Sequence, residues 1–241
     1  MRSIRAKWLT SAEGRLKILP GLRQSLTSYP PNSADASWRG CGRAGGHDGD
    51  TLRGWCGPAS GPASSARDED VYRHVVGTTK SFCPEAVGVR AHRLFYDFTL
   101  VHVYREVGLQ YDSSCFLPMA PDLRPVRSAR DLVEIPIYYM DYWDLLEGAS
   151  RWRLDALPLE QPGVKVFDFH PNLVFMNAST MSEYVASKDY YRDAERLRAL
   201  RRSGRGVRTL FLDLLDFIAA KGAETRGLAD LNTQWREHSR P

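Results

Sequence analysis

Long apolar runs are missing from this chain of 241 residues. No stretch approaches the ~18 consecutive apolar residues that a transmembrane helix needs. The basic residues near the start are not followed by the apolar core of roughly 7 to 15 residues that is typical of signal peptides. The sequence therefore predicts a cytoplasmic protein without a membrane span.

Closely spaced metal ligands are also scarce. The chain contains no Cys-x-x-Cys, no two adjacent Asp residues and no two His residues four positions apart. His47 with Asp48 and Asp50 lies in a glycine-rich stretch and is a poor substitute. Because zinc sites take their ligands from such closely spaced pairs, we expect no metal-binding residues. The four cysteines are interpreted as reduced, unpaired thiols.

The net charge of +4 is unevenly distributed along the chain. Residues 1–66 hold nine Lys or Arg and four acidic residues, a balance of +5, so the remainder carries −1. A nucleic-acid-binding domain usually presents an excess of basic residues. The globular part is therefore not expected to bind nucleic acid.

Residues 1–66 do not resemble a folded domain. Ten of the 19 glycines lie there, with clustered Ser and Arg and no sustained hydrophobic period. Such a segment buries too little apolar surface to offset its ordering entropy, so we expect it to be disordered. Two origins stay open: a genuine flexible tail, or the product of a G+C-rich gene read out of frame. Residues 67–241 then form the single folded domain.

Strands alternating with helices indicate an α/β fold with a mainly parallel sheet or barrel. The hydrophobic pattern predicts helices over 70–78, 94–107, 182–202 and 207–221. It predicts strands over 86–92, 109–111, 133–137 and 164–169, with a loop over 118–130 and irregular structure over 144–162, where Trp143 and Trp152 are anchors. In the helix over 207–221, one apolar face contains Phe211, Leu214, Leu215 and Ile218.

One histidine lies at the end of a predicted core strand. Val164, Val166, Phe167 and Phe169 form the strand, and His170 follows directly before Pro171. In parallel α/β sheets the carboxyl ends of the strands carry the chemistry. An isolated His is weak evidence for a site, so the alternative is a histidine that merely bonds a backbone carbonyl.

Three motifs together resemble the polysaccharide deacetylase family, in its WbmS-like branch linked to O-antigen synthesis. They are Gly88-Val-Arg-Ala-His92, Gly108-Leu-Gln-Tyr-Asp-Ser-Ser-Cys-Phe116 and Val166-Phe-Asp-Phe-His-Pro171. Two further stretches, 134–141 and 206–215, fit the same pattern, and the resemblance covers about residues 68–222. It implies a distorted β/α barrel that hydrolyses sugar N-acetyl groups with zinc or another divalent metal.

The resemblance assigns roles to individual residues of this chain. His170 matches the general acid, and Arg90 matches the arginine that orients the catalytic carboxylate. His92, Asp141 and Trp143 are then cleft residues that contact the carbohydrate substrate. Asp112 is interpreted as a structural cap of the turn after its strand.

The first two motifs of the family, Asp-Asp and His-x-x-x-His, are absent. We therefore predict a partial barrel that lacks its N-terminal strands, with the family's metal not bound by this chain. Three functions follow: an N-deacetylase whose metal ligands are unrecognised, a non-catalytic sugar-binding or assembly protein, and the inactive product of a damaged gene. The sequence does not predict the sugar or the oligomeric state.

Overall fold

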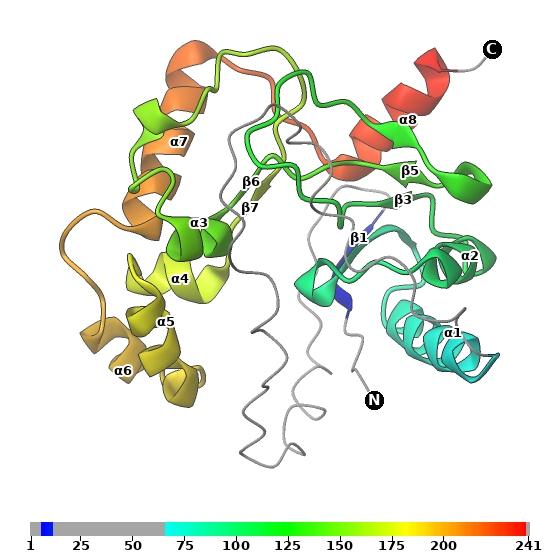
Figure 1. The fold of residues 1–241 in the computed structure, drawn as a ribbon, viewed down its shortest axis with the longest axis horizontal. Helices are drawn as coiled ribbons and strands as arrows, with labels where there is room; N and C mark the ends of the chain where they lie inside the picture. The colour runs from blue at the N-terminus through cyan, green and yellow to red at the C-terminus, as the bar shows by residue number, and fades with distance from the viewer. Residues whose placement is uncertain (1–5, 12–65, 240–241) are drawn as a thin grey trace, which may run out of the picture.

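Parallel strands joined by helices form the centre of the protein, for which a computed structural model describes residues 6–11 and 66–239 (Figure 1). The strands are β1 (Ala6–Ser11), β2 (Ala86–Ala91), β3 (Tyr111–Asp112), β4 (Val126–Arg127), β5 (Val133–Glu134), β6 (Tyr139–Met140) and β7 (Phe167–Asp168). The larger sheet has the order β1-β2-β3-β5-β4. Its three inner strands are parallel, whereas β1 and β4 are antiparallel to their neighbours. β6 and β7 form a separate parallel pair.

The helices lie in two groups on either side of the strands (Figure 1). One group holds α1 and α2, and the other holds α3 to α7, while α8 lies beside the larger sheet. The helices are α1 (Ala66–Ser81), α2 (Phe98–Glu106), α3 (Asp141–Glu147), α4 (Pro171–Met176), α5 (Met181–Ser187), α6 (Ala194–Ala199), α7 (Val207–Lys221) and α8 (Leu228–His238). No helix within the described ranges is long and apolar enough to cross a bilayer.

The predicted α/β class is confirmed. The long helices and the strands of the larger sheet's centre lie largely where the hydrophobic pattern places them. α7 has the predicted bounds and ends at Gly222, which adopts the left-handed conformation with φ 59°. Gly108, with φ 80°, follows α2 in the same way. The two sheets are small and, within the described residues, do not close. The distorted barrel therefore remains a proposal.

Several elements differ from the predictions because local polar groups override the hydrophobic period. The helix predicted over 182–202 is divided, since the Asp193 carboxylate accepts a bond from the Arg196 N–H and starts α6 there. Gly77 lies inside α1 and does not end it. On α7, Leu215 is exposed, and the buried face is Val207, Leu210 and Leu214. The predicted apolar face was therefore wrong at Leu215.

The elements that were not predicted are the short β4, β6, α3 and α4, together with β1 and α8 at the two ends of the described chain. β1 pairs with β2 at the edge of the larger sheet, inside the segment expected to be disordered. The rest of that segment falls outside the described residues, so its expected disorder stays a prediction. α8 is anchored by Arg236, whose guanidinium donates to the Gln110 carbonyl at 2.8 Å and to the Asp131 carboxylate at 2.9 Å. Because these contacts join residues far apart in the sequence, a local hydrophobic pattern does not reveal them.

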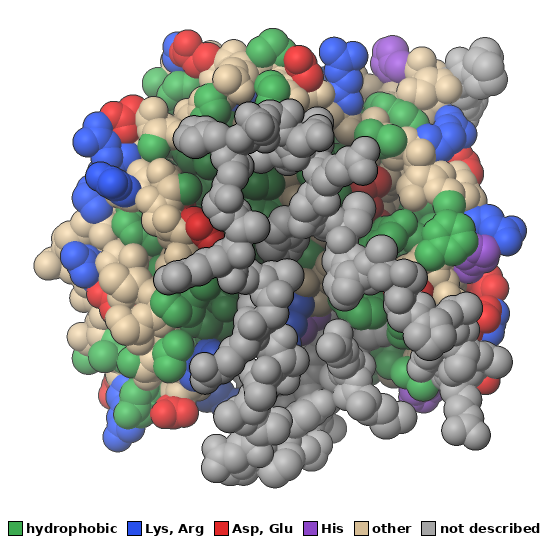
Figure 2. Space-filling view, viewed as in Figure 1, with side chains coloured by type: hydrophobic (Ala, Val, Ile, Leu, Met, Phe, Trp, Pro, Cys, Tyr) green, Lys and Arg blue, Asp and Glu red, His purple; other side chains and the backbone are tan. Residues whose placement is uncertain are grey.

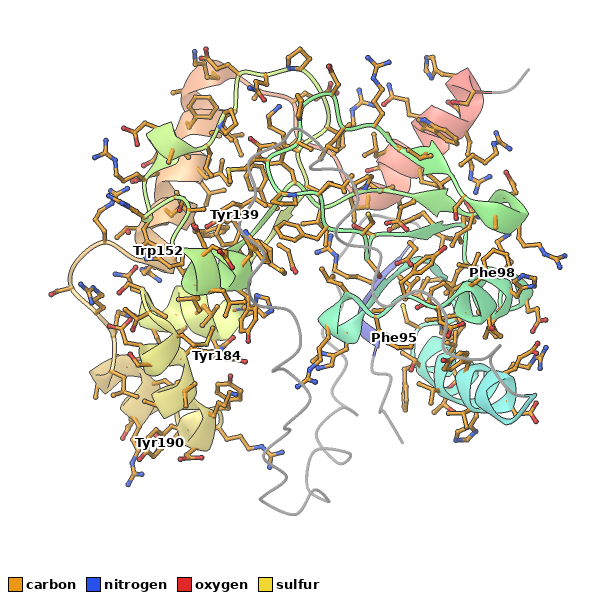
Figure 3. The ribbon with its side chains drawn as sticks, in the orientation of Figure 1. Phe95, Phe98, Tyr139, Trp152, Tyr184 and Tyr190 are labelled. Carbon is orange, nitrogen blue, oxygen red and sulfur yellow. The ribbon has the colours of Figure 1, made fainter. Side chains whose placement is uncertain are left out.

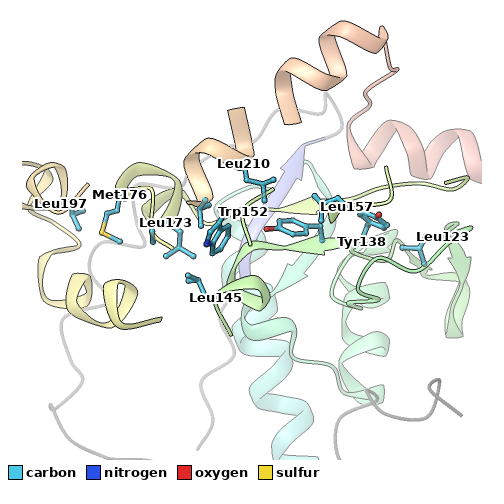
Figure 4. Packing of buried hydrophobic residues seen from close by; sticks show 12 residues of the cluster. Leu123, Tyr138, Leu145, Trp152, Leu157, Leu173, Met176, Leu197 and Leu210 are labelled. Carbon is cyan, nitrogen blue, oxygen red and sulfur yellow. The ribbon is translucent and has the colours of Figure 1, made fainter. Parts of the chain in front are cut away.

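The apolar core on the side of α3 and α7 is organised around Trp152, as predicted for this anchor. Tyr139 and Trp152 both lie on that side of the molecule (Figure 3), and a close view shows Trp152 among leucines from α4 and α7 (Figure 4). The Trp152 indole is 7% exposed, and its Nε1–H donates to the Ser179 carbonyl at 3.1 Å. Charged side chains of both signs surround the visible face of the described part (Figure 2).

Gly88 is required by the close approach of β2 to β3. A Cβ at position 88 would lie 1.9 Å from the Cζ of Tyr111, whose side chain is 1% exposed. The ring cannot move aside in a packed core, so Gly88→Ala is expected to destabilise the protein by about 3 kcal/mol. Urea unfolding measures this, with Gly77→Ala as control because nothing lies within 4 Å of its added Cβ. Equal stability of the two variants would contradict the packing.

Candidate functional site

The carboxyl ends of β6 and β7 bring Asp141 and His170 together. Asp141 is the first residue of α3 and directly follows β6. His170 follows β7 after one residue and precedes Pro171, which begins α4. Because the two strands are parallel neighbours, the residues that follow them meet at one edge. The predicted position of His170 at a strand end is confirmed.

Asp141 holds the histidine by two hydrogen bonds. Its Oδ1 lies 2.5 Å from the His170 Nδ1, and its Oδ2 accepts the His170 backbone N–H at 2.7 Å. The Asp141 side chain is fully buried, whereas that of His170 is 19% exposed. Burial raises the pKa of the Asp141 carboxyl, and the hydrogen bond from His170 opposes this rise. A proton on Nδ1 leaves the lone pair on Nε2, so the ring is set for proton transfer there.

Arg90 connects β2 to the same edge. Its Nε and Nη2 donate to the backbone carbonyl and the hydroxyl of Ser113, both at 2.9 Å. Its Nη1 donates to the Asp168 carboxylate at 3.1 Å, and both side chains of this ion pair are 14% exposed. Asp168 lies two residues before His170, and alternate residues of a strand share a face. This spacing could have identified Asp168, which the sequence analysis missed.

The planar guanidinium of Arg90, a fork of donors, leads to a specific prediction. Lysine keeps the charge but cannot reach the Ser113 hydroxyl, the Ser113 carbonyl and Asp168 together. Arg90→Lys is therefore expected to lower the free energy of unfolding by roughly 2 kcal/mol. The matched control is Arg127→Lys, because Arg127 forms an ion pair with Asp131 that is about half exposed and contributes little. Chemical denaturation of both variants measures whether Arg90→Lys lowers the free energy of unfolding more than Arg127→Lys does.

A buried pair of carboxyl groups lies beneath Arg90. Asp112 and Glu134 are register partners on the parallel strands β3 and β5, so their side chains share one face. The Ser114 hydroxyl donates to Asp112 at 2.5 Å, which fits the predicted turn cap. Burial raises the pKa of Asp112 to about 7. Burial and then the charge of Asp112 raise that of Glu134 to about 8. The sequence analysis missed this pair because Glu134 is one charge within an apolar strand.

The two other predicted cleft residues have different surroundings. His92 is partly buried and begins the turn after β2, at the same edge as Arg90. The Trp143 ring packs edge-on against Phe116 at 5.6 Å, within the core between the sheet and α8. Its neighbour Tyr142 faces the site instead, with its ring centroid 6.1 Å from that of His170. Trp143 therefore packs in the core, and Tyr142 was missed.

A divalent metal does not fit the side chains described here. Residues 6–11 and 66–239 contain no group of three His, Cys, Asp or Glu side chains that could hold an ion. The donors near His170 are committed to other bonds, since Asp141 accepts twice from that histidine and Asp168 pairs with Arg90. No step of the chemistry below is therefore assigned to a metal.

Comparisons with known proteins give one family. A model of WbmS-like polysaccharide deacetylases matches residues 60–188. The structure is also similar to a crystal structure, at 1.90 Å resolution, of a Bordetella bronchiseptica protein described as a polysaccharide deacetylase involved in O-antigen biosynthesis. The identity is 27% and the TM-score 0.54, over 60% of this chain and 61% of the other. The chain thus spans less than two thirds of that relative. No curated protein matches it.

Proposed function

This chain belongs to the WbmS-like polysaccharide deacetylase family, and we propose that His170 protonates the sugar amine released when an N-acetyl group is hydrolysed. The observation that carries this proposal is the double hydrogen bond between Asp141 and His170. A histidine that served only as a structural donor would not need a fully buried carboxylate on both its ring and its backbone.

The proposed chemistry follows from the tautomer that Asp141 imposes. Water adds to the acetamide carbonyl and releases one proton to the solvent. The C–N bond then breaks as the sugar nitrogen takes up a proton, and the acetic acid that leaves ionises to acetate. In its protonated form His170 supplies that proton from Nε2, because Nδ1 stays bonded to Asp141. The carboxylate stabilises the imidazolium before transfer and keeps the ring oriented afterwards. Arg90 and Asp168 act as positioning residues that join β2 to the strand bearing His170.

The substrate that we propose is a cell-surface carbohydrate. Support comes from the family match and from the relative described as involved in O-antigen biosynthesis. A non-catalytic sugar-binding protein is the second candidate, favoured by the lack of a metal-binding group among the described residues. A cytoplasmic location remains a prediction of the sequence.

Replacing His170 tests the proposal. The full chain is expected to release acetate from N-acetylglucosamine oligosaccharides, and His170→Gln should lower the rate by about 10²-fold or more. Glutamine can still accept or donate a hydrogen bond but transfers no proton, so oligosaccharide binding should persist. The control is His102→Gln, because the His102 ring packs on Phe98 in α2, away from this edge. Sugar binding without acetate release by the unaltered chain would favour the second candidate.

A further inference from the structure

A strained turn follows β2, the strand whose Arg90 reaches Asp168 in the strand pair that carries the proposed site. Arg93 and Leu94 follow β2 with φ angles of 59° and 52°, although neither is glycine. Such conformations are unfavourable for residues other than glycine and persist only where packing holds them. Leu94 supplies that packing, because its side chain contacts the core cluster that contains Tyr111. The turn therefore fixes the place of Arg93, which is exposed.

The charge of Arg93 acts on Tyr142, which packs between His170 and Tyr184. The Tyr142 ring lies 6.1 Å from the His170 ring and 5.5 Å from the Tyr184 ring, between centroids. Burial and then Tyr184 raise the pKa of the Tyr142 phenol, and the positive charge of Arg93 opposes that rise. Tyr184 comes from α5 (Figure 3), Tyr142 from α3 and Arg93 from the turn after β2.

Among the described residues, Arg93 differs from Arg90 in having no acidic partner. Arg90 is neutralised by Asp168 at 3.1 Å. Within residues 66–239, no carboxylate lies in ion-pairing distance of Arg93. A guanidinium held by a strained turn three residues beyond Arg90, with no counter-charge among the described residues, is suited to an anion that arrives with the ligand.

We propose that Arg93, Tyr142 and Tyr184 form a subsite for a negatively charged sugar, one bearing a carboxylate or a phosphate, next to His170. The guanidinium pairs with the anionic group, and the tyrosine rings pack on the apolar face of the sugar ring. The inference rests on the proposed function in that it makes this sugar part of the same carbohydrate. It adds a substrate class: a polymer or precursor with acidic residues.

The test compares three probes on the full chain by calorimetry: N-acetylglucosamine, its 1-phosphate, and an N-acetylated hexosaminuronate. At low salt the anionic probes are expected to bind about tenfold more tightly than the neutral one. Arg93→Gln should abolish that preference, and Arg93→Lys should restore part of it. Comparing the affinity for the uronate with that for the phosphate identifies which anion the subsite prefers.

Arg130 provides a matched control for Arg93. It occupies the centre of a similar turn with φ 56° and ψ 30°, compared with φ 59° and ψ 22° for Arg93, and it is exposed. Its turn precedes β5, so it lies at the opposite edge of the sheet. Arg130→Gln should leave the preference for anionic probes unchanged.

The outcomes separate this subsite from the proposed function. Equal binding of all three probes, a preference that survives Arg93→Gln, or an equal loss in Arg130→Gln would overturn the subsite. Acetate release that depends on His170, without any preference for anions, contradicts the subsite alone. A preference for anions that depends on Arg93, without acetate release, contradicts the proposed function alone.

Discussion

Replacing Asp141 by Asn is expected to lower acetate release by about 10²- to 10³-fold while the protein stays folded. An amide at position 141 can donate to the His170 Nδ1, which would place the ring proton on Nε2 and remove the orientation that proton transfer needs. The negative charge that stabilises the imidazolium is also lost. Burial already raises the pKa of Asp141, so a neutral amide of the same shape removes an unfavourable buried charge.

Asp144 is the matched control for Asp141. It is also buried in α3, but its carboxylate accepts the Tyr139 hydroxyl at 2.6 Å and the Ser150 N–H at 2.7 Å. Asp144→Asn is therefore expected to lower the free energy of unfolding by roughly 1 to 3 kcal/mol. Acetate release per folded molecule should change little. If the two variants lose acetate release equally, the special role of the Asp141 and His170 pair is wrong.

Stability should fall by several kcal/mol as the pH rises from about 5 to 8. The Asp112 and Glu134 carboxyl groups, with pKa values raised to about 7 and about 8, still bind protons in the folded state where the unfolded chain has released them. The folded state therefore binds more protons than the unfolded state in this window. Their stabilising contribution is fully present below the unfolded pKa values, and it is lost as the pH rises through the folded ones.

Asp112→Asn separates this pair from other titrating groups. The amide can still accept the Ser114 hydroxyl, and it removes one of the two buried charges. Urea unfolding at pH 5 and pH 8 should show less than half of the original difference in stability. Glu106→Gln is the control, since that exposed carboxylate has a lowered pKa and is ionised throughout the window. A protein as stable at pH 8 as at pH 5 would show that the pair is hydrated.

Local patterns in the sequence predict those parts of the fold that local forces determine. α7 was predicted with correct bounds because a hydrophobic period runs between two glycines. β2 was predicted within one residue for a similar reason. β1 was missed because its pairing with β2 is a long-range contact in a stretch without a pattern. α8 was missed because Arg236 anchors it through polar groups far away in the sequence.

The site shows the same division between local and long-range information. His170 and Arg90 stand in motifs, so their positions at strand ends could be predicted. The pairings could not be predicted, because the register between β6 and β7 decides that Asp141 meets His170, and the packing of β2 against β7 decides that Arg90 pairs with Asp168. The Asp112 and Glu134 pair likewise depends on the register between β3 and β5.

The most direct test of the account is the protonation of the His170 ring nitrogens, measured by nitrogen-15 NMR on histidine-labelled full chain with His170→Gln for assignment. At a pH where the imidazole is neutral, the account predicts a proton on Nδ1, a lone pair on Nε2 and a change of this pattern in Asp141→Asn. A His170 with its proton on Nε2 in the unaltered chain, or a pattern unaffected by Asp141→Asn, would contradict the role of Asp141 in setting this site.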